Sequence, residues 1–360
     1  MLCLVTLGDP RRLTGGYLYH LRMASAARRH RARIVFLSFP ERPFPLPALV
    51  TPRVLRRARQ LGVRAILLDS IAAAFAGPWL AARLPAAPLI GVLHQPPGGI
   101  DHGRVRTRLQ APFDRLAYRD ARLLIVASDL LADQLAAAGV ERERIRVVPP
   151  GRDVAAAPAE RHDLRAGRRA AFVCVANWMQ RKGILELLDA VARLPPELAT
   201  LHLAGDEQAD QAYAARVRRR LARSDLAARV VVHGALSRER VAALYAGADA
   251  FVLPAFREPY GTVWGEAMAF GVPVVGWRAG NLPYLAEDGR EGLLVPPGDI
   301  EGLARALQLL ATDARLRTRL GQAAGRRAST RPTWEEAAAL FFEAIRSALE
   351  GTPARGPGGP

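Results

Sequence analysis

The sequence predicts an α/β protein built from two doubly wound parallel sheets that face each other across a cleft. Three observations lead to this fold class. Short apolar runs alternate with longer amphipathic stretches along the chain, as strands alternate with helices. The alternation stops near residue 150 and starts again near residue 170. The length of 360 residues also suits two domains of ordinary size.

The first half of the chain contains six short apolar runs and five longer amphipathic stretches. The apolar runs predict strands at residues 1–7, 33–38, 65–69, 88–93, 122–127 and 145–148. The amphipathic stretches predict helices at 16–29, 52–61, 72–83, 104–120 and 129–138. Because strands and helices alternate, the sheet is expected to be parallel with helices on both faces, in an N-terminal domain over 1–153.

The second half repeats the pattern. Apolar runs predict strands at 171–176, 200–204, 229–232, 249–253, 272–276 and 292–295. Helices are predicted at 182–193, 208–223, 237–246, 262–270, 281–286, 300–311 and 313–325. We therefore expect a C-terminal domain over 170–330, after a linker at 154–169 that is rich in Ala, Pro and charge. A last helix at 331–349, packed back on the N-terminal domain, and a disordered Gly/Pro tail at 350–360 complete the chain.

The formal charge of +17 is unevenly distributed. Residues 1–153 hold 24 basic and 11 acidic side chains, whereas residues 154–360 hold 27 and 23. The first half is therefore where an anionic partner would act, although a GC-rich coding sequence would also produce so much arginine. No Cys/His finger spacing, RNA-binding aromatic motif or basic heptad region is present, which argues against a nucleic-acid partner.

The ends and the cysteines predict a cytoplasmic protein. Residues 1–7 read as a first strand and not as a signal peptide. The longest apolar stretch, residues 65–82, contains Asp69 and a Gly-Pro break, so it does not suit a membrane span. Cys3 and Cys174 fall in apolar runs and are expected to be core thiols in a reducing compartment.

Two loops in the second half carry candidate chemistry, because ligands of open parallel sheets bind where loops leave the carboxyl ends of strands. One loop contains Glu258 and leads into a helix near Thr262, and Glu266 follows one turn later. The free amides of that helix start can hold a diphosphate, and a carboxylate can accept two ribose hydroxyls. The other loop contains Lys182, the only lysine of the chain. By spacing alone, the two glutamates could also be a chance pair on a solvated surface.

Two weaker signals lie in the first half. Gly15 and Gly16 follow the first strand, with His20 four residues later, and paired glycines allow a backbone to approach a ligand closely. His94 ends an apolar strand, where a structurally satisfied histidine is the common alternative.

In order and spacing, these blocks resemble the retaining glycosyltransferases of family 4, which have the GT-B fold of two Rossmann-like domains. The resemblance covers about residues 1–345 and includes "ARLLIVASDLLADQL", "ERERIRVVPPGRD", "LSRERVAALYAGADAFVLPAFREPYG" and "AEDGREGLLVPPGD". It implies a hexosyltransferase that moves a sugar from a nucleotide diphosphate sugar to an acceptor hydroxyl, with the donor on the C-terminal domain and the acceptor on the N-terminal one. A noncatalytic nucleotide-sugar binder and a nucleotide-sugar epimerase remain the alternatives.

The resemblance also implies residue roles. Glu266 would bind the donor ribose, and Glu258 would lie beside the transferred sugar. The amides of Tyr260, Gly261 and Thr262 would take the distal phosphate, and Lys182 would neutralise the leaving diphosphate. The remaining implied positions are Gly16 on the donor-phosphate side, His94 near sugar and acceptor, and Gly234 near the base. His94, Lys182 and Glu258 are therefore the candidate catalytic residues.

The chain departs from the family pattern in three places. Asn177 stands where the family commonly has an arginine, so either Arg181 reaches the phosphate or that contact is missing. Pro150-Gly151 replaces a usual Asn-Gly, and Tyr284 replaces a usual glutamate. No Asp-x-Asp motif follows a predicted strand, so we expect no metal and no cofactor beyond the nucleotide-sugar substrate, with Lys182 and the helix start countering the leaving-group charge.

The acceptor is expected to be either lipid-linked or anionic, because the first hundred residues hold 14 basic and 3 acidic side chains. The segment 52–62 places Val54, Leu55, Ala58 and Leu61 on one helical face and most of its arginines elsewhere. Such a helix can lie on an anionic bilayer at the inner membrane face. An ordinary helix packed on its own sheet explains the same pattern.

Overall fold

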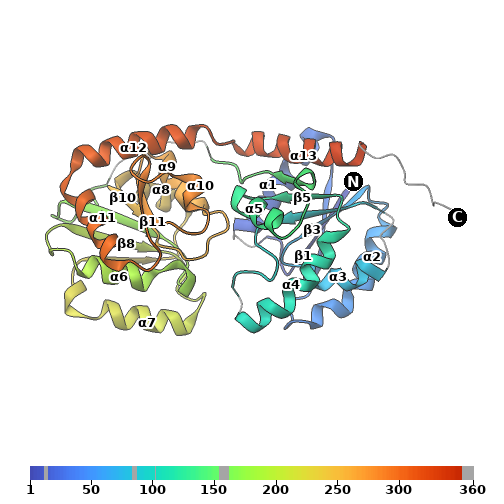
Figure 1. Ribbon diagram of the computed structural model, residues 1–360, viewed down its shortest axis with the longest axis horizontal. Helices are drawn as coiled ribbons and strands as arrows, with labels where there is room; N and C mark the ends of the chain where they lie inside the picture. The colour runs from blue at the N-terminus through green and yellow to red at the C-terminus, as the bar shows by residue number, and fades with distance from the viewer. Residues whose placement is uncertain (12–14, 83–86, 102, 154–161, 351–360) are drawn as a thin grey trace. The chain divides into compact units, whose positions relative to one another are not determined.

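The computed structural model describes residues 1–11, 15–82, 87–101, 103–153 and 162–350. The chain forms two compact units (Figure 1). The N-terminal unit comprises Met1–Gly151 together with the chain from Pro332 onward, and the C-terminal unit comprises Arg152–Arg331. The predicted fold class is confirmed, because each unit contains a six-stranded parallel sheet flanked by helices.

In the N-terminal unit the strand order is β2-β1-β3-β4-β5-β6. The strands are β1 (Leu2–Leu7), β2 (Ile34–Phe39), β3 (Ala65–Asp69), β4 (Leu89–Leu93), β5 (Leu123–Val126) and β6 (Ile145–Val147). The helices are α1 (Gly15–Ala26), η1 (Ala27–His30), η2 (Leu46–Val50), α2 (Thr51–Gln60), α3 (Ala73–Ala82), α4 (Arg104–Arg119), α5 (Asp129–Ala137), η3 (Arg142–Arg144) and α13 (Trp334–Glu350). Each predicted element of the first half is present within a few residues, and η2 is an element that the apolar periodicity did not predict.

Alternate residues of these strands supply two separate cores, as a parallel sheet buried on both faces requires. Leu4, Leu67 and Ile125 face one core, which is covered by α1 and α13. Val5, Leu68 and Leu124 face the other core, which is covered by α2, α3, α4 and α5. Helix α13 therefore completes a unit whose other elements lie almost two hundred residues earlier.

Helix α2 is an ordinary packed helix. Val54 and Leu55 pack against the core of the N-terminal unit, and Ala58 is buried in it. The apolar side chains of this helix are therefore covered within their own unit, whereas its arginines and Gln60 are exposed. Among the residues that the structure describes, no helix is long and apolar enough to cross a membrane.

In the C-terminal unit the strand order is β12-β11-β10-β7-β8-β9. The strands are β7 (Ala170–Val175), β8 (Ala199–Ala204), β9 (Val230–Gly234), β10 (Ala250–Val252), β11 (Val274–Trp277) and β12 (Gly292–Val295). The helices are η4 (Gln180–Lys182), α6 (Ile184–Ala192), α7 (Gln211–Leu221), η5 (Ser224–Leu226), α8 (Arg238–Gly247), α9 (Thr262–Ala269), α10 (Leu282–Leu285), α11 (Ile300–Thr312) and α12 (Ala314–Ser329).

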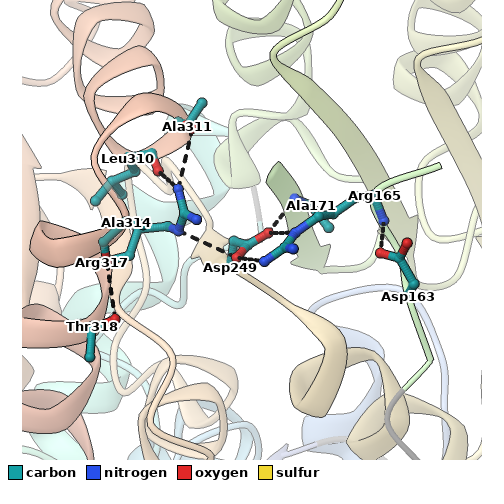
Figure 2. A network of polar contacts seen from close by, with 9 residues as sticks. All are labelled: Asp163, Arg165, Ala171, Asp249, Leu310, Ala311, Ala314, Arg317 and Thr318. Carbon is teal, nitrogen blue, oxygen red and sulfur yellow. Dashed lines mark hydrogen bonds and ion pairs between the residues drawn. The ribbon is translucent and has the colours of Figure 1, made fainter. Parts of the chain in front are cut away.

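Part of the expected linker packs on the C-terminal unit and belongs to it. Residues 154–161 lie outside the described residues, whereas 162–169 lie in this unit. Figure 2 shows one of the contacts: Arg165 donates from Nε and Nη2 to the carboxylate of Asp249, at 2.9 and 2.8 Å. Arg317 of α12 lies 3.3 Å from the same carboxylate, and the amide of Ala171 donates to it. The tail expected at 350–360 lies outside the described residues from residue 351 onward.

A buried carboxyl group holds the loop that follows β4. Asp114 of α4 is 1% exposed and accepts hydrogen bonds from the Gly98 amide at 2.7 Å and from the Gln110 side chain at 3.3 Å. Burial raises the pKa of Asp114 to about 6, against these hydrogen bonds, which act to lower it. Because the folded state holds this proton more tightly than the unfolded state, the contribution of Asp114 to stability is lost as the pH rises through about 4 to 6.

Between mildly acidic and neutral pH, the free energy of unfolding of the wild type should fall by up to about 3 kcal/mol because of Asp114. In Asp114→Asn this fall should be absent. Asparagine keeps an oxygen that can accept from Gly98 but cannot ionise. The measurement is urea unfolding of both proteins across this pH range. The exposed Asp133→Asn is the matched control, and parallel pH profiles for wild type and Asp114→Asn would contradict the assignment.

Candidate active site

Each sheet has a switch point, where the strand order reverses and the chain continues on the other side of the first strand. In the C-terminal unit it lies between β7 and β10, and in the N-terminal unit between β1 and β3. Loops at the carboxyl ends of the flanking strands form the usual ligand crevice of such sheets. The loops containing Lys182 and Glu258 flank the first switch point, and the loop before Gly16 and the residues after Asp69 flank the second.

Lys182 lies at the end of the short helix η4, and α6 begins only at Ile184, two residues later than predicted. Gly183 separates the two helices with a φ of 70°, a conformation that favours glycine. A Cβ at this position would also collide with the carbonyl of Pro254, two residues after the end of β10. The close approach brings the lysine loop against the loop that contains Glu258.

The carboxylate of Glu258 contacts two cationic side chains. Its Oε2 atom accepts hydrogen bonds from Nζ of Lys182 and, at 3.1 Å, from Nη1 of Arg181. All three side chains are 13% exposed. Burial acts to raise the pKa of Glu258, but the charges of Lys182 and Arg181 outweigh it and leave that pKa below its ordinary value. The glutamate is therefore ionised at neutral pH, and the cluster carries one net positive charge.

The helix start beside this cluster also matches the prediction. Helix α9 begins at Thr262, directly after Gly261, which has a φ of 77°. A Cβ on Gly261 would collide with the ring of the buried Trp264, so only glycine fits here. Tyr260, Gly261 and Thr262 thus supply the first amides of a helix N-terminus, where the helix dipole favours an anion.

Asn281 holds the loop that contains Glu258, and the sequence analysis did not name it as a candidate. It is 2% exposed, its side-chain amide donates to the Tyr260 carbonyl at 2.8 Å, and its backbone amide donates to the Glu258 carbonyl at 2.9 Å. It lies after β11, the next strand beyond β10. A polar residue with a glycine before it, at a strand end next to a candidate loop, was the available signal.

Glu266 lies in α9, four residues after the helix start at Thr262. Tyr245 donates from Oη to Oε2 of Glu266 at 3.2 Å. Burial raises the pKa of Glu266 above its ordinary value, although the charge of Arg238 and the Tyr245 hydroxyl act to lower it. Gly234 ends β9, two strands away from β7, and its carbonyl accepts from the Gly205 amide at 2.8 Å. The two residues therefore lie at separate places along the carboxyl edge of the same sheet.

The N-terminal unit contains a second polar cluster, centred on Asp69. The Oδ2 atom of Asp69 lies 3.0 Å from Nε2 of His20 and accepts from the Thr6 hydroxyl at 2.6 Å. All three residues are at most 2% exposed. Burial acts to raise the pKa of Asp69, but His20 and Thr6 outweigh it and lower that pKa to about 2. The sequence analysis named His20 only as part of a motif and missed its carboxylate partner, which lies 49 positions later.

His94 packs on this cluster from the end of β4. Its ring centre lies 4.9 Å from that of His20, and its backbone amide donates to the Ser70 hydroxyl, which in turn donates to Asp69. Burial and the nearby His20 lower the pKa of His94 to about 3, so its imidazole is neutral at pH 7. Its Nε2 atom has no hydrogen-bond partner among the described residues. Gly16 lies directly against the ring, since a Cβ there would be 3.4 Å from it.

The structure therefore brings the predicted residues together in two groups. Gly16 and His94 are in contact in the N-terminal unit. Arg181, Lys182 and Glu258 form one cluster in the C-terminal unit, with the amides of Tyr260, Gly261 and Thr262 in the same loop. Asn177 does not take the place of the missing family arginine, because its side chain accepts from the Asp206 amide, whereas Arg181 reaches the cluster.

Comparison with known families and structures defines the class of protein. A family model described as glycosyl transferases group 1 matches residues 169–313, and one described as a glycosyl transferase 4-like domain matches residues 2–151. The chain is therefore a member of the group 1 glycosyltransferases, and both matched regions contain the clusters described above.

Two curated relatives support this membership. The chain is 31% identical over 303 residues to a D-inositol 3-phosphate glycosyltransferase of Xylanimonas cellulosilytica, an alignment that covers 77% of this chain and 70% of the relative. It is 34% identical over 215 residues to the lipopolysaccharide core biosynthesis glycosyltransferase LpsE of Rhizobium meliloti, covering 58% of this chain and 59% of LpsE.

Solved structures share the fold. The Anabaena protein HepE in complex with UDP-glucose superposes with a TM-score of 0.80 at 23% identity, over 96% of this chain and all of HepE. Sucrose-phosphate synthase from Thermosynechococcus elongatus superposes with a TM-score of 0.81 at 20% identity, over 98% and 99% of the two chains.

Proposed function

We propose that this protein transfers a hexosyl group from a nucleoside diphosphate sugar to an acceptor hydroxyl, with retention of the anomeric configuration and without a metal ion. The observation that carries the proposal is the cluster of Glu258 with Lys182 and Arg181 beside the start of α9. Two cations and free helix amides provide the positive charge that a departing diphosphate needs. The structure of HepE with UDP-glucose supports a donor of this class.

The three charged side chains are proposed to have different roles at the donor. Lys182 and Arg181 neutralise the diphosphate as the bond to the sugar breaks, so that no divalent ion is required for leaving-group charge. The same two cations orient Glu258, which accepts hydrogen bonds from the sugar hydroxyls. Arg181 thus takes the part of the family arginine that is absent at Asn177.

Retention is proposed to occur by attack of the acceptor on the face from which the diphosphate leaves. Glu258 is a poor candidate for a covalent nucleophile, because both cations engage its Oε2 atom and its pKa is lowered. His94 offers a neutral imidazole with an unpaired Nε2, which suits a hydrogen bond to a sugar or acceptor hydroxyl.

The buried thiols Cys3 and Cys174, whose pKa values burial raises to about 12, suit the reducing cytoplasm in which we place the reaction.

The decisive experiment incubates the purified protein with UDP-glucose and other nucleotide sugars, in the presence of excess EDTA. We expect the true donor to raise the unfolding temperature of the protein. We also expect slow hydrolysis of that donor, in which water takes the sugar and the nucleoside diphosphate is released. NMR should show that the released sugar first has the donor's anomeric configuration. Binding without release would favour a noncatalytic binder, and conversion of the sugar without release would favour an epimerase. An obligatory divalent ion would show that the roles of Lys182 and Arg181 are incomplete.

Glu266→Ala should weaken donor binding by about 1–3 kcal/mol, because a charge-assisted contact to the ribose is lost. The fold should survive, since Glu266 is bound to the rest of the unit mainly through the Tyr245 hydroxyl. Calorimetric titration with the nucleoside diphosphate measures the effect. Glu301→Gln, a change at an exposed residue, is the control. An unchanged affinity in folded Glu266→Ala would contradict the proposal that Glu266 binds the donor ribose.

A further inference from the structure

Helix α4 exposes an apolar stripe to solvent. Val105, Leu109 and Phe113 follow one another at intervals of four residues, and their exposed fractions are 74%, 58% and 41%. The opposite side of the helix is already buried, with Asp114 and Tyr118 turned inward. A helix on the surface of a soluble protein normally presents polar residues on the face that α4 makes apolar. Among the described residues of its own unit, nothing covers this face fully.

Helix η2 also carries exposed apolar side chains, starting two residues after Phe44, which contacts α4. Leu46 and Leu49 are 47% and 73% exposed. The segment before η2 meets α4 directly, because the guanidinium of Arg106 lies 5.6 Å from the centre of the Phe44 ring. An open hollow of about 570 Å³ lies at this junction, lined by Pro43, Phe44, Gly103, Val105, Arg106 and Leu109. We call the five exposed side chains Leu46, Leu49, Val105, Leu109 and Phe113 the apolar patch.

The surroundings of the apolar patch are strongly basic. Helix α4 adds exposed Arg108, Arg115 and Arg119, whereas Asp114, the acidic residue of this helix, is buried. Helix α2, which packs beside η2, contains no acidic residue. Four of its arginines are exposed: Arg53, Arg56, Arg57 and Arg59. An apolar centre with an arginine rim is complementary to a surface that is apolar inside and anionic outside.

We propose that the apolar patch and its arginines dock this protein on an anionic lipid surface. The apolar side chains would enter the boundary between headgroups and acyl chains, and the arginines would contact lipid phosphates. A second copy of the chain fits less well, because two such rims would bring like charges together. The proposal is independent of the donor chemistry, and it assigns the apolar contact to η2 and α4, not to the packed face of α2.

Sedimentation with vesicles tests the proposal on the full chain. Vesicles of phosphatidylcholine alone are compared with vesicles that contain about one third phosphatidylglycerol, a content at which lipid charge attracts basic segments. The bound fraction should rise with the anionic lipid and fall with salt. The double variant Val105→Gln/Leu109→Gln should weaken binding about tenfold or more, because two exposed apolar side chains no longer enter the bilayer. The double variant Arg108→Gln/Arg115→Gln should weaken it by a similar factor.

Matched controls lie on the helix layer over the opposite face of the same sheet. Leu340 of α13 is 44% exposed and Arg346 is also exposed, so Leu340→Gln and Arg346→Gln should bind vesicles like the wild type. Thermal unfolding checks that each variant is folded. Equal, negligible binding to both vesicle types at low salt would overturn the proposal. So would analytical ultracentrifugation showing a dimer that Val105→Gln/Leu109→Gln dissociates, because the patch would then belong to an interface between copies.

Discussion

Lys182→Arg is expected to lower kcat about a hundredfold, the cost of misplacing a catalytic contact by roughly an ångström. The lysine ammonium meets Glu258 in a space that Arg181 already shares, and all three side chains are 13% exposed. A planar guanidinium is larger and cannot occupy that position without displacing Glu258 or the diphosphate. Steady-state kinetics with the donor found by screening measures the change.

The matched control is Arg219→Lys, because Arg219 lies exposed on α7 of the same unit. It should leave kcat unchanged. Binding of the nucleoside diphosphate to Lys182→Arg should fall much less than kcat, since both side chains carry the same charge. Wild-type turnover in Lys182→Arg would show that the lysine is an ordinary cation in a chain where every other basic residue is arginine.

Glu258→Gln is expected to change turnover and product affinity in opposite directions. Turnover should fall about a hundredfold, because the sugar loses the carboxylate that accepts from its hydroxyls. Affinity for the nucleoside diphosphate should rise about tenfold, since Lys182 and Arg181 lose the anion that now neutralises them. Kinetics and calorimetry on the same preparation separate the two effects.

Glu301→Gln serves as the control for Glu258→Gln, because Glu301 is 75% exposed and its distance to Arg305 is 3.8 Å. A parallel fall of turnover and affinity in Glu258→Gln would indicate a disordered loop, and would remove the electrostatic argument. The contacts of Asn281 with the backbone of this loop do not involve the Glu258 side chain, so the loop should keep its conformation.

Local sequence determined the fold class and most of the C-terminal cluster. Strand and helix periodicities act over a few residues, so the alternation of β and α elements could be predicted within a few positions. Lys182 and Glu258 were predicted because each follows an apolar strand, and carboxyl ends of parallel strands share one edge of the sheet. The sequence left open whether Arg181 joins them, and the structure brings its guanidinium to Glu258 in the loop that Gly183 holds against Pro254.

Only the tertiary structure decided which distant polar residues pair and which apolar faces are covered. Asp69 and His20 lie on neighbouring elements of one switch point, and Asn281 reaches Glu258 from the adjacent strand. Such pairs leave no periodic trace in the chain. Helices α2 and α4 are both basic and amphipathic, yet the apolar face of α2 is covered, whereas α4 buries one side in the core and leaves an apolar stripe exposed. Periodicity shows that a helix has an apolar face, whereas the packing of the whole unit decides whether anything buries it.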